Sequence, residues 1–118
     1  MYREIKVGDQ SIPMKATGST PIRYRLLFGE DLLSEFSNVE SNSSLAIGTI
    51  SQLAYVMAMS GAGADMTKLT KDGYIDWLDQ FEPFDLTEAA EAIVDLYIGN
   101  TKGTSEVKKK AGDAVKES

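Results

Sequence analysis

The feature that most constrains the fold is an uncharged stretch that runs from Ser41 to Ala64. Within it, "LAIGTISQLAYVMAM" spreads apolar residues over most of a helical surface: Leu45, Ile47, Ile50, Leu53, Ala54, Met57 and Ala58. A helix that is apolar nearly all round is buried, either in a bilayer or at the centre of a protein. Polar residues and glycines interrupt the stretch, and its purely apolar runs are far shorter than the roughly 20 residues that a bilayer requires. We therefore expect a central helix, capped by Ser44 and ended by Gly61 or Gly63.

The segment before it, residues 2–16 ("YREIKVGDQSIPMKA"), alternates between apolar and polar positions. Ile5 and Val7 share one side of a first strand, and a second strand has on one side Ile12, Met14 and Ala16. Gly8-Asp9 between the two runs favours a tight turn, because glycine accepts the positive φ that such turns need. Pro13 lacks an N–H and belongs at a sheet edge. The pattern predicts a β-hairpin whose apolar face rests on helices.

A first helix begins within "TGSTPIRYRLLFGEDLLSEF", where Thr20 is the expected N-cap and Pro21 the first helical residue. Helical spacing then predicts an inward side made of Ile22, Leu26, Leu33 and Phe36, widened by Phe28 and Leu32. A phosphate loop of the Walker type needs glycines at both ends and a lysine before Ser or Thr, and "ATGSTP" has neither. Residues 37–44, "SNVESNSS", are expected to form a polar loop.

Two more helices follow the central one. The first is predicted from Thr70 to Glu82, where Pro83 stops it, with an apolar side made of Ile75, Trp77, Leu78 and Phe81. In the second, Asp85 and Glu88 match a capping box, and the inward residues are Leu86, Ala90, Ile93, Val94 and Tyr97. The expected fold class is thus mainly α with an N-terminal β-hairpin (α+β), a small bundle of about four helices.

The end of the chain has a different character from the rest. Residues 100–118 hold only Val107 and Val115 as large aliphatic residues, too few to offset the entropy of ordering, so we expect a disordered tail. Residues 1–98 carry 7 bases and 15 acids, whereas residues 99–118 carry 5 bases and 3 acids. The predicted organisation is one helical domain over residues 1–99 and a flexible tail over residues 100–118.

Composition excludes several functional classes. The 118 residues include no cysteine and no histidine, which removes disulfides, thiolate zinc sites and the usual general base. A net charge of −6 argues against nucleic-acid binding over the whole surface. The run Lys108–Lys110 suits a solubilising end, or a contact of the tail with nucleic acid or an acidic partner. No signal peptide and no membrane segment are expected.

Carboxylates are the remaining route to catalysis or metal binding. Asp72, Asp76 and Asp79 stand at i, i+4 and i+7, so they share one face of the predicted helix and offer the oxygen ligands that Ca²⁺ or Mg²⁺ prefer. A solvated polar face opposite the apolar side explains the same spacing. No Asp-x-Asp-x-Asp-Gly loop accompanies them, and no cofactor is expected.

The order of motifs adds a resemblance. "MKATGSTPIRYRLLFGEDLL", "ISQLAYVMAM", "YIDWLDQFEPFDL" and "AIVDLYIGN", together spanning about residues 10–99, resemble tail assembly chaperones of long-tailed bacteriophages and related prophages. The resemblance implies a non-enzymatic protein of the host cytoplasm during virus assembly. Such chaperones coat the tape-measure protein until tail-tube subunits polymerise around it, and they are absent from the finished virion.

In many relatives a ribosomal frameshift near the end appends a second domain, which is thought to recruit the tail-tube protein. The resemblance therefore implies a second partner through an extended form, with an A-rich slippery site at the codons of Lys108–Lys110. The absence of a slippery heptamer there would remove this hypothesis. The family offers no set of functional residues to transfer position by position.

For the partner surface we expect the central helix around Tyr55 and Met59 together with the start of the first helix at Arg23 and Arg25. Methionine suits surfaces that accept varied apolar partners, although core filling explains it equally well. Self-association is compatible with the same surface. The alternatives to a chaperone are a carboxylate-based metal-binding protein or enzyme and a generic acidic adaptor.

Overall fold

The computed structural model describes residues 1–32, 34–35 and 47–99. It contains a two-stranded antiparallel hairpin, β1 (Tyr2–Val7) and β2 (Gln10–Lys15), then α1 (Thr20–Phe28), α3 (Ile47–Gly61), a short 3₁₀ turn η1 (Met66–Lys68), α4 (Lys71–Leu78) and α5 (Asp85–Ile98). These elements form one compact globule with the predicted α+β architecture. The predicted loop at 37–44 and the tail at 100–118 lie outside the described residues.

The hairpin has the predicted pattern and turn. Ile5 lies opposite Ile12 in the antiparallel register, and both side chains are buried on the same face. Arg3, which breaks the alternation, faces Met14. Gly8 has a φ of 61° in the turn, the left-handed conformation that glycine supplies without steric cost. The other face, which includes Pro13, is directed away from the core.

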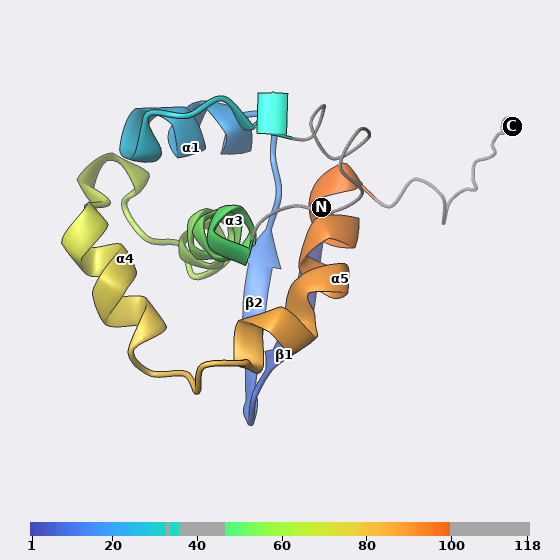
Figure 1. Cartoon of the computed structure of the whole chain (residues 1–118). Helices are drawn as coiled ribbons and strands as arrows, with labels where there is room; N and C mark the ends of the chain where they lie inside the picture. The colour runs from blue at the N-terminus through green and yellow to red at the C-terminus, as the bar shows by residue number, and fades with distance from the viewer. Residues whose placement is uncertain (33, 36–46, 100–118) are drawn as a thin grey trace, which may run out of the picture.

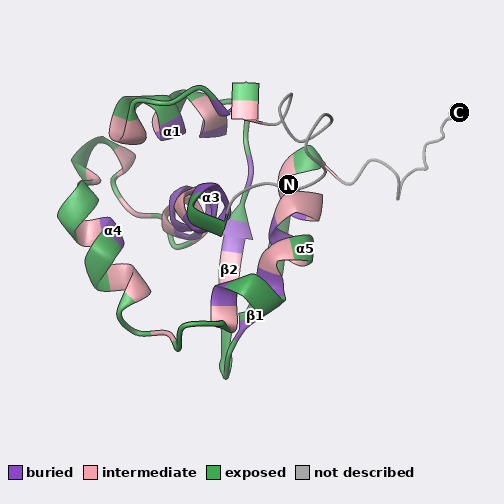
Figure 2. Cartoon of the chain, viewed as in Figure 1, coloured by how far each residue is buried: buried purple, intermediate pink, exposed green. Residues whose placement is uncertain are grey.

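The central position predicted for the uncharged stretch is confirmed. Figure 1 shows α3 end-on, with α1 above it, α4 to its left and β2 to its right, while α5 runs along the hairpin farther to the right. α3 contacts β2, α5, α1 and α4, and α5 also covers β1. Figure 2 shows buried residues over most of α3, among them the predicted Ile50, Leu53, Ala54, Met57 and Ala58. No helix among the described residues is long and apolar enough to cross a bilayer.

Residues at the start of α3 differ from the prediction. Ile47 remains 46% exposed although the periodicity placed it in the core. Ser44 and Leu45 lie outside the described residues. At the other end, Gly61 is the last helical residue, and Gly63 follows it with a φ of 76°. The N–H of Gly63 donates to Ser60 and that of Ala64 to Met59, the pair of bonds of a Schellman C-terminus.

The inward side of α1 is not the predicted one. Ile22 is 57% and Leu26 is 72% exposed, whereas Tyr24 is fully buried and Phe28 packs against the core. The hydroxyl of Tyr24 donates a 2.7 Å hydrogen bond to the side-chain carbonyl of Gln52 on α3, which satisfies the polar end of a buried ring. That partner, 28 residues away, makes it favourable to bury the tyrosine and leave the aliphatic residues outside.

The ends of α1 also differ slightly from the prediction. Ser19 is the N-cap residue and makes no side-chain cap bond, while Thr20 is the first helical residue. Gly29, with a φ of 78°, ends the helix in the left-handed conformation, and its N–H donates to Arg25. The helix therefore ends at Phe28, earlier than predicted from an apolar stripe that extends to Phe36. Leu32 is buried as expected, and Leu33 and Phe36 lie outside the described residues.

α4 and α5 follow the predicted order with corrected ends and faces. α4 begins after Thr70, whose hydroxyl accepts from the N–H of Gly73, but it ends at Leu78 and not at Glu82. Ile75 is 50% exposed, and the buried residue of α4 is Tyr74. Trp77, Leu78 and Phe81 pack against the core as predicted.

The capping box predicted for α5 is wrong. Phe84 is the N-cap residue without a side-chain cap bond, and the carboxylate of Asp85 accepts from the N–H of Glu82, 2.9 Å away, in the preceding turn. Leu86 and Ile93 are buried as predicted, together with Ala89 and Leu96. The predicted Ala90, Val94 and Tyr97 are partly buried against the same core.

Candidate functional site

The carboxylates singled out in the sequence lie along α4. Asp72 is in its first turn, Asp76 follows one turn later, and Asp79 is the C-cap residue. All three are exposed. Within residues 1–32, 34–35 and 47–99, no group of three or more acidic, histidine or cysteine side chains is arranged to hold a metal ion. The spacing of the three aspartates thus corresponds to a solvated helix face.

A row of aromatic rings fastens α1 and α4 to α3. Successive ring centroids lie 5.0–5.6 Å apart, in tilted or edge-to-face arrangements, along Tyr24, Phe28, Tyr74, Tyr55, Trp77 and Phe81. Such pairs stabilise a core beyond the area that they bury. Tyr55 lies inside the row and is 4% exposed, and burial raises the pKa of its hydroxyl. Its ring is committed to packing within the domain.

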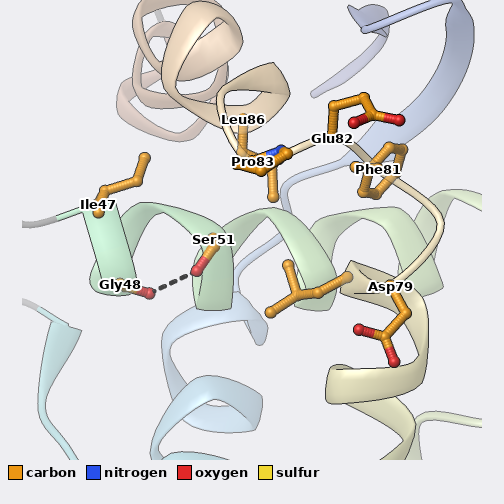
Figure 3. Close-up of a pocket in the computed structure, with 9 residues that line it drawn as sticks. Ile47, Gly48, Ser51, Asp79, Phe81, Glu82, Pro83 and Leu86 are labelled. Atoms are coloured by element: carbon orange, nitrogen blue, oxygen red, sulfur yellow. Dashed lines mark hydrogen bonds between the residues drawn. The ribbon is translucent and has the colours of Figure 1, made fainter.

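One groove lies where α3 begins and α5 begins. It has a volume of about 330 Å³ and is lined by Ile47, Gly48, Ser51, Leu78, Asp79, Phe81, Glu82, Pro83 and Leu86 (Figure 3). The Ser51 hydroxyl donates to the carbonyl of Gly48 at 2.9 Å and lies 2.7 Å from the Tyr74 hydroxyl. Because that hydroxyl is already engaged twice, the groove offers mainly apolar surface with carboxylates from Asp79 and Glu82.

A second groove, here called the Met59 groove, lies between β2, the end of α3 and α4. It has a volume of about 240 Å³ and is lined by Gln10, Ser11, Ile12, Pro13, Ala58, Met59, Ala62, Trp77 and Gln80. Beside this groove, α3 approaches β2 closely at Gly61. A Cβ added there would collide with the Pro13 carbonyl group, whose carbon would be 2.7 Å away. Met59 and Trp77 are half-buried, so each presents apolar surface to the groove and to the core.

The third groove lies between α1 and η1. It has a volume of about 200 Å³ and is lined by Arg23, Leu26, Leu27, Met66, Thr67 and Leu69. η1 is held by Asp65, whose carboxylate accepts from the N–H and the hydroxyl of Thr67 at 3.0 and 2.6 Å. These hydrogen bonds lower the pKa of Asp65, and the nearby charge of Arg23 adds to the effect. We refer to this feature as the α1–η1 groove.

The four residues predicted to bind a partner do not form one surface. Arg23 lines the α1–η1 groove, and Arg25 is exposed on the same helix. Met59 lines the Met59 groove, while Tyr55 is inside the aromatic row. Sequence reasoning did not find the grooves, because each is formed by elements distant in the chain. The predicted inward position of Leu26 is wrong, since an apolar helical stripe does not reveal whether another element covers it.

Comparison of the chain with protein-family models, with curated proteins and with solved structures found no match. The surface geometry and the order of the motifs are therefore the basis for a functional proposal.

Proposed function

We propose that this chain is a tail assembly chaperone, which binds the tape-measure protein of a long-tailed phage in the host cytoplasm and keeps it soluble until the tail tube encloses it. The order of its motifs resembles that family over about residues 10–99. A tape-measure protein is long and helical, and its apolar stripes are exposed before the tube forms. A partner that covers short stretches of such a stripe needs an open apolar surface and no catalytic group.

The observation that carries the proposal is the Met59 groove. A groove lined by an unbranched methionine, an indole edge and small residues such as Ala58 and Ala62 accepts the apolar side of a helix without demanding one side-chain shape. The groove is shallow and shared among three elements, which favours moderate affinity. Moderate affinity is required, because the growing tube has to displace each copy.

Charge supports the same role. Residues 1–98 have 15 acids against 7 bases, so a tape-measure protein coated with many copies acquires a strongly negative surface. Like charge keeps such complexes apart in solution. A frameshift-extended product that recruits the tail-tube protein belongs to this proposal and is tested by inspecting the gene around the codons of Lys108–Lys110.

The test is co-expression with a fragment of the long helical protein expected from the neighbouring reading frame. The chaperone should shift that fragment from the pellet to the supernatant, and Met59→Asp should reduce the recovered complex about tenfold, as expected for loss of an apolar anchor. Since Met59 also touches the core, Ala62→Glu serves as a second variant at an exposed position of the same groove. Both variants must retain the wild-type helical circular dichroism.

The matched control is Ile98→Asp, which introduces the same charge at a 45% exposed residue at the end of α5, outside the three grooves. It should leave the complex intact. If the fragment stays insoluble with wild-type protein, the proposed function is wrong. If it is rescued equally by all variants, the chaperone role stands and the Met59 groove is not the binding surface. Saturable heat on titration with Ca²⁺, Mg²⁺ or Mn²⁺ would favour a metal-binding protein instead.

A further inference from the structure

Two helices of this chain carry opposite charges. α1 contains Arg23 and Arg25 and no acidic residue, although the chain as a whole is acidic. α5 contains four acids, Asp85, Glu88, Glu91 and Asp95, and no basic residue. In Figure 1, α1 crosses the top of the molecule and α5 runs along the hairpin at the right, so the outer faces of the two helices point in different directions. A basic outer face and an acidic outer face that point in different directions can meet only between two copies of the chain.

The outer face of α1 is apolar as well as basic. Ile22, Arg25 and Leu26 stand at i, i+3 and i+4, so they share one helix face, and all three are exposed. Leu26 is 72% exposed, the second-largest value among the large apolar residues of the described chain. The α1–η1 groove runs beside this face and adds Leu27, Met66 and Leu69 as apolar lining.

The outer face of α5 combines the complementary features. Phe84, directly before the helix, is 73% exposed. Glu88 and Glu91 follow at i+4 and i+7, which places them on the same face as the ring, and both are exposed. The inward side of α5 is occupied by other residues, namely Leu86, Ala89, Ile93 and Leu96. A large aromatic side chain is thus presented to solvent beside two carboxylates.

We propose that the outer face of α1 in one copy docks on the outer face of α5 in a second copy. The phenyl ring of Phe84 enters the α1–η1 groove beside Leu26, and a volume of about 200 Å³ has room for one aromatic side chain. The carboxylates of Glu88 and Glu91 lie toward the guanidinium group of Arg25 on the outer face of α1. Apolar contact supplies the affinity, and the opposite charges orient the two copies.

The contact is of the head-to-tail kind. α1 and the start of α5 lie at opposite ends of the body in Figure 1, so a pair of copies uses one contact and leaves one face of each kind open. The net charge of −6 opposes association at a distance, and the contact should be weak between free copies. Copies held side by side on one long helical partner would have a high effective concentration, which would make coating cooperative.

The test is sedimentation velocity of the full chain from about 10 μM to about 1 mM, which covers dissociation constants of weak contacts. A salt concentration of about 150 mM screens net repulsion beyond roughly 8 Å but preserves direct contacts. The weight-average mass of the wild type should increase steadily with concentration. Leu26→Asp and Phe84→Asp should each weaken association at least tenfold, and neither residue is part of the core.

The decisive measurement is an equimolar mixture of these two variants. Leu26→Asp retains an intact α5 face and Phe84→Asp an intact α1 face, so the mixture should form one-to-one heterodimers that do not grow further. Arg25→Glu and Glu88→Arg, each monomeric alone, should likewise associate when mixed. Ile75→Asp, at a 50% exposed residue of α4, is the control and should associate like the wild type.

Several results would overturn the proposal. A wild type that remains monomeric up to about 1 mM would do so, because the contact would then be absent in the relevant range. A mixture of Leu26→Asp and Phe84→Asp that stays monomeric would exclude a head-to-tail contact between these two faces. Equal loss of association in Ile75→Asp would show that the effect is not confined to α1 and α5.

Discussion

The contact between α3 and β2 gives a matched pair of glycine substitutions with opposite expected effects. Gly48 and Gly61 are both in α3, near its two ends. Among the described atoms, a Cβ at Gly48 would meet nothing within 4 Å, whereas at Gly61 it would collide with the Pro13 carbonyl group and approach the Cα of Met14 to 3.0 Å. Gly48→Ala should therefore stabilise the domain, and Gly61→Ala should destabilise it.

The magnitudes follow from two competing terms. Replacing glycine by alanine in a helix favours folding by up to about 1 kcal/mol. At Gly61 this gain is opposed by overpacking of about 1–3 kcal/mol, and the upper part of that range applies because the neighbours of the added Cβ are backbone atoms that cannot rotate away. We expect a net loss of about 2 kcal/mol for Gly61→Ala, which lowers the melting temperature by roughly 10 °C. Gly48→Ala should raise it by a few degrees.

The assay is thermal and urea unfolding of the two variants and the wild type, followed by circular dichroism. Urea midpoints compared at equal m-values separate a change in stability from a change in compactness. A Gly61→Ala variant as stable as Gly48→Ala would refute the reasoning. It would mean that α3 does not approach β2 as closely as the structure shows, and the packing of these two elements beside the Met59 groove would have to be revised.

Two further predictions concern buried hydroxyls. Burial, followed by the charge of Glu30, raises the pKa of Tyr24 from 10.0 to about 12. The unfolded chain therefore loses this proton at a lower pH than the folded chain, and the free energy of unfolding should fall between pH 10 and 12. Tyr24→Phe should flatten that decline, and an unchanged decline in urea titrations at stepped pH would contradict the assignment. Ser51 donates to Gly48, so Tyr74 is the donor in the 2.7 Å bond between the two hydroxyls. Ser51→Ala leaves the buried Tyr74 hydroxyl without its acceptor and should lower the free energy of unfolding, measured in urea, by about 1–3 kcal/mol. Tyr74→Phe removes the donor itself and should lower it by only about 0.5–1.5 kcal/mol. The reverse order would contradict this assignment.

The candidate grooves were less accessible to sequence reasoning than the fold. The sequence identified Met59 and Arg23 as surface residues of interest, and both line grooves. It did not reveal that the two grooves are separate, because each is lined by residues from elements far apart in the chain. The sequence predicts Tyr55 at the partner surface because of its neighbours along the chain, whereas its ring packs against Tyr74 and Trp77 of α4.

The spacing of apolar residues along the chain is enough to specify the hairpin and the central helix. An alternation of period two leaves each strand with one apolar face, and in the hairpin these faces bring Ile5 opposite Ile12. A helix that is apolar on nearly all sides is stable only when the other elements surround it. Tertiary structure decided which face of the short helices α1 and α4 turned inward. Tyr24 and Tyr74 are buried because Gln52 and Ser51 on α3 satisfy their hydroxyls, while Leu26 remains exposed. The helical period is the same for either face, and only the partner on another element distinguishes between them.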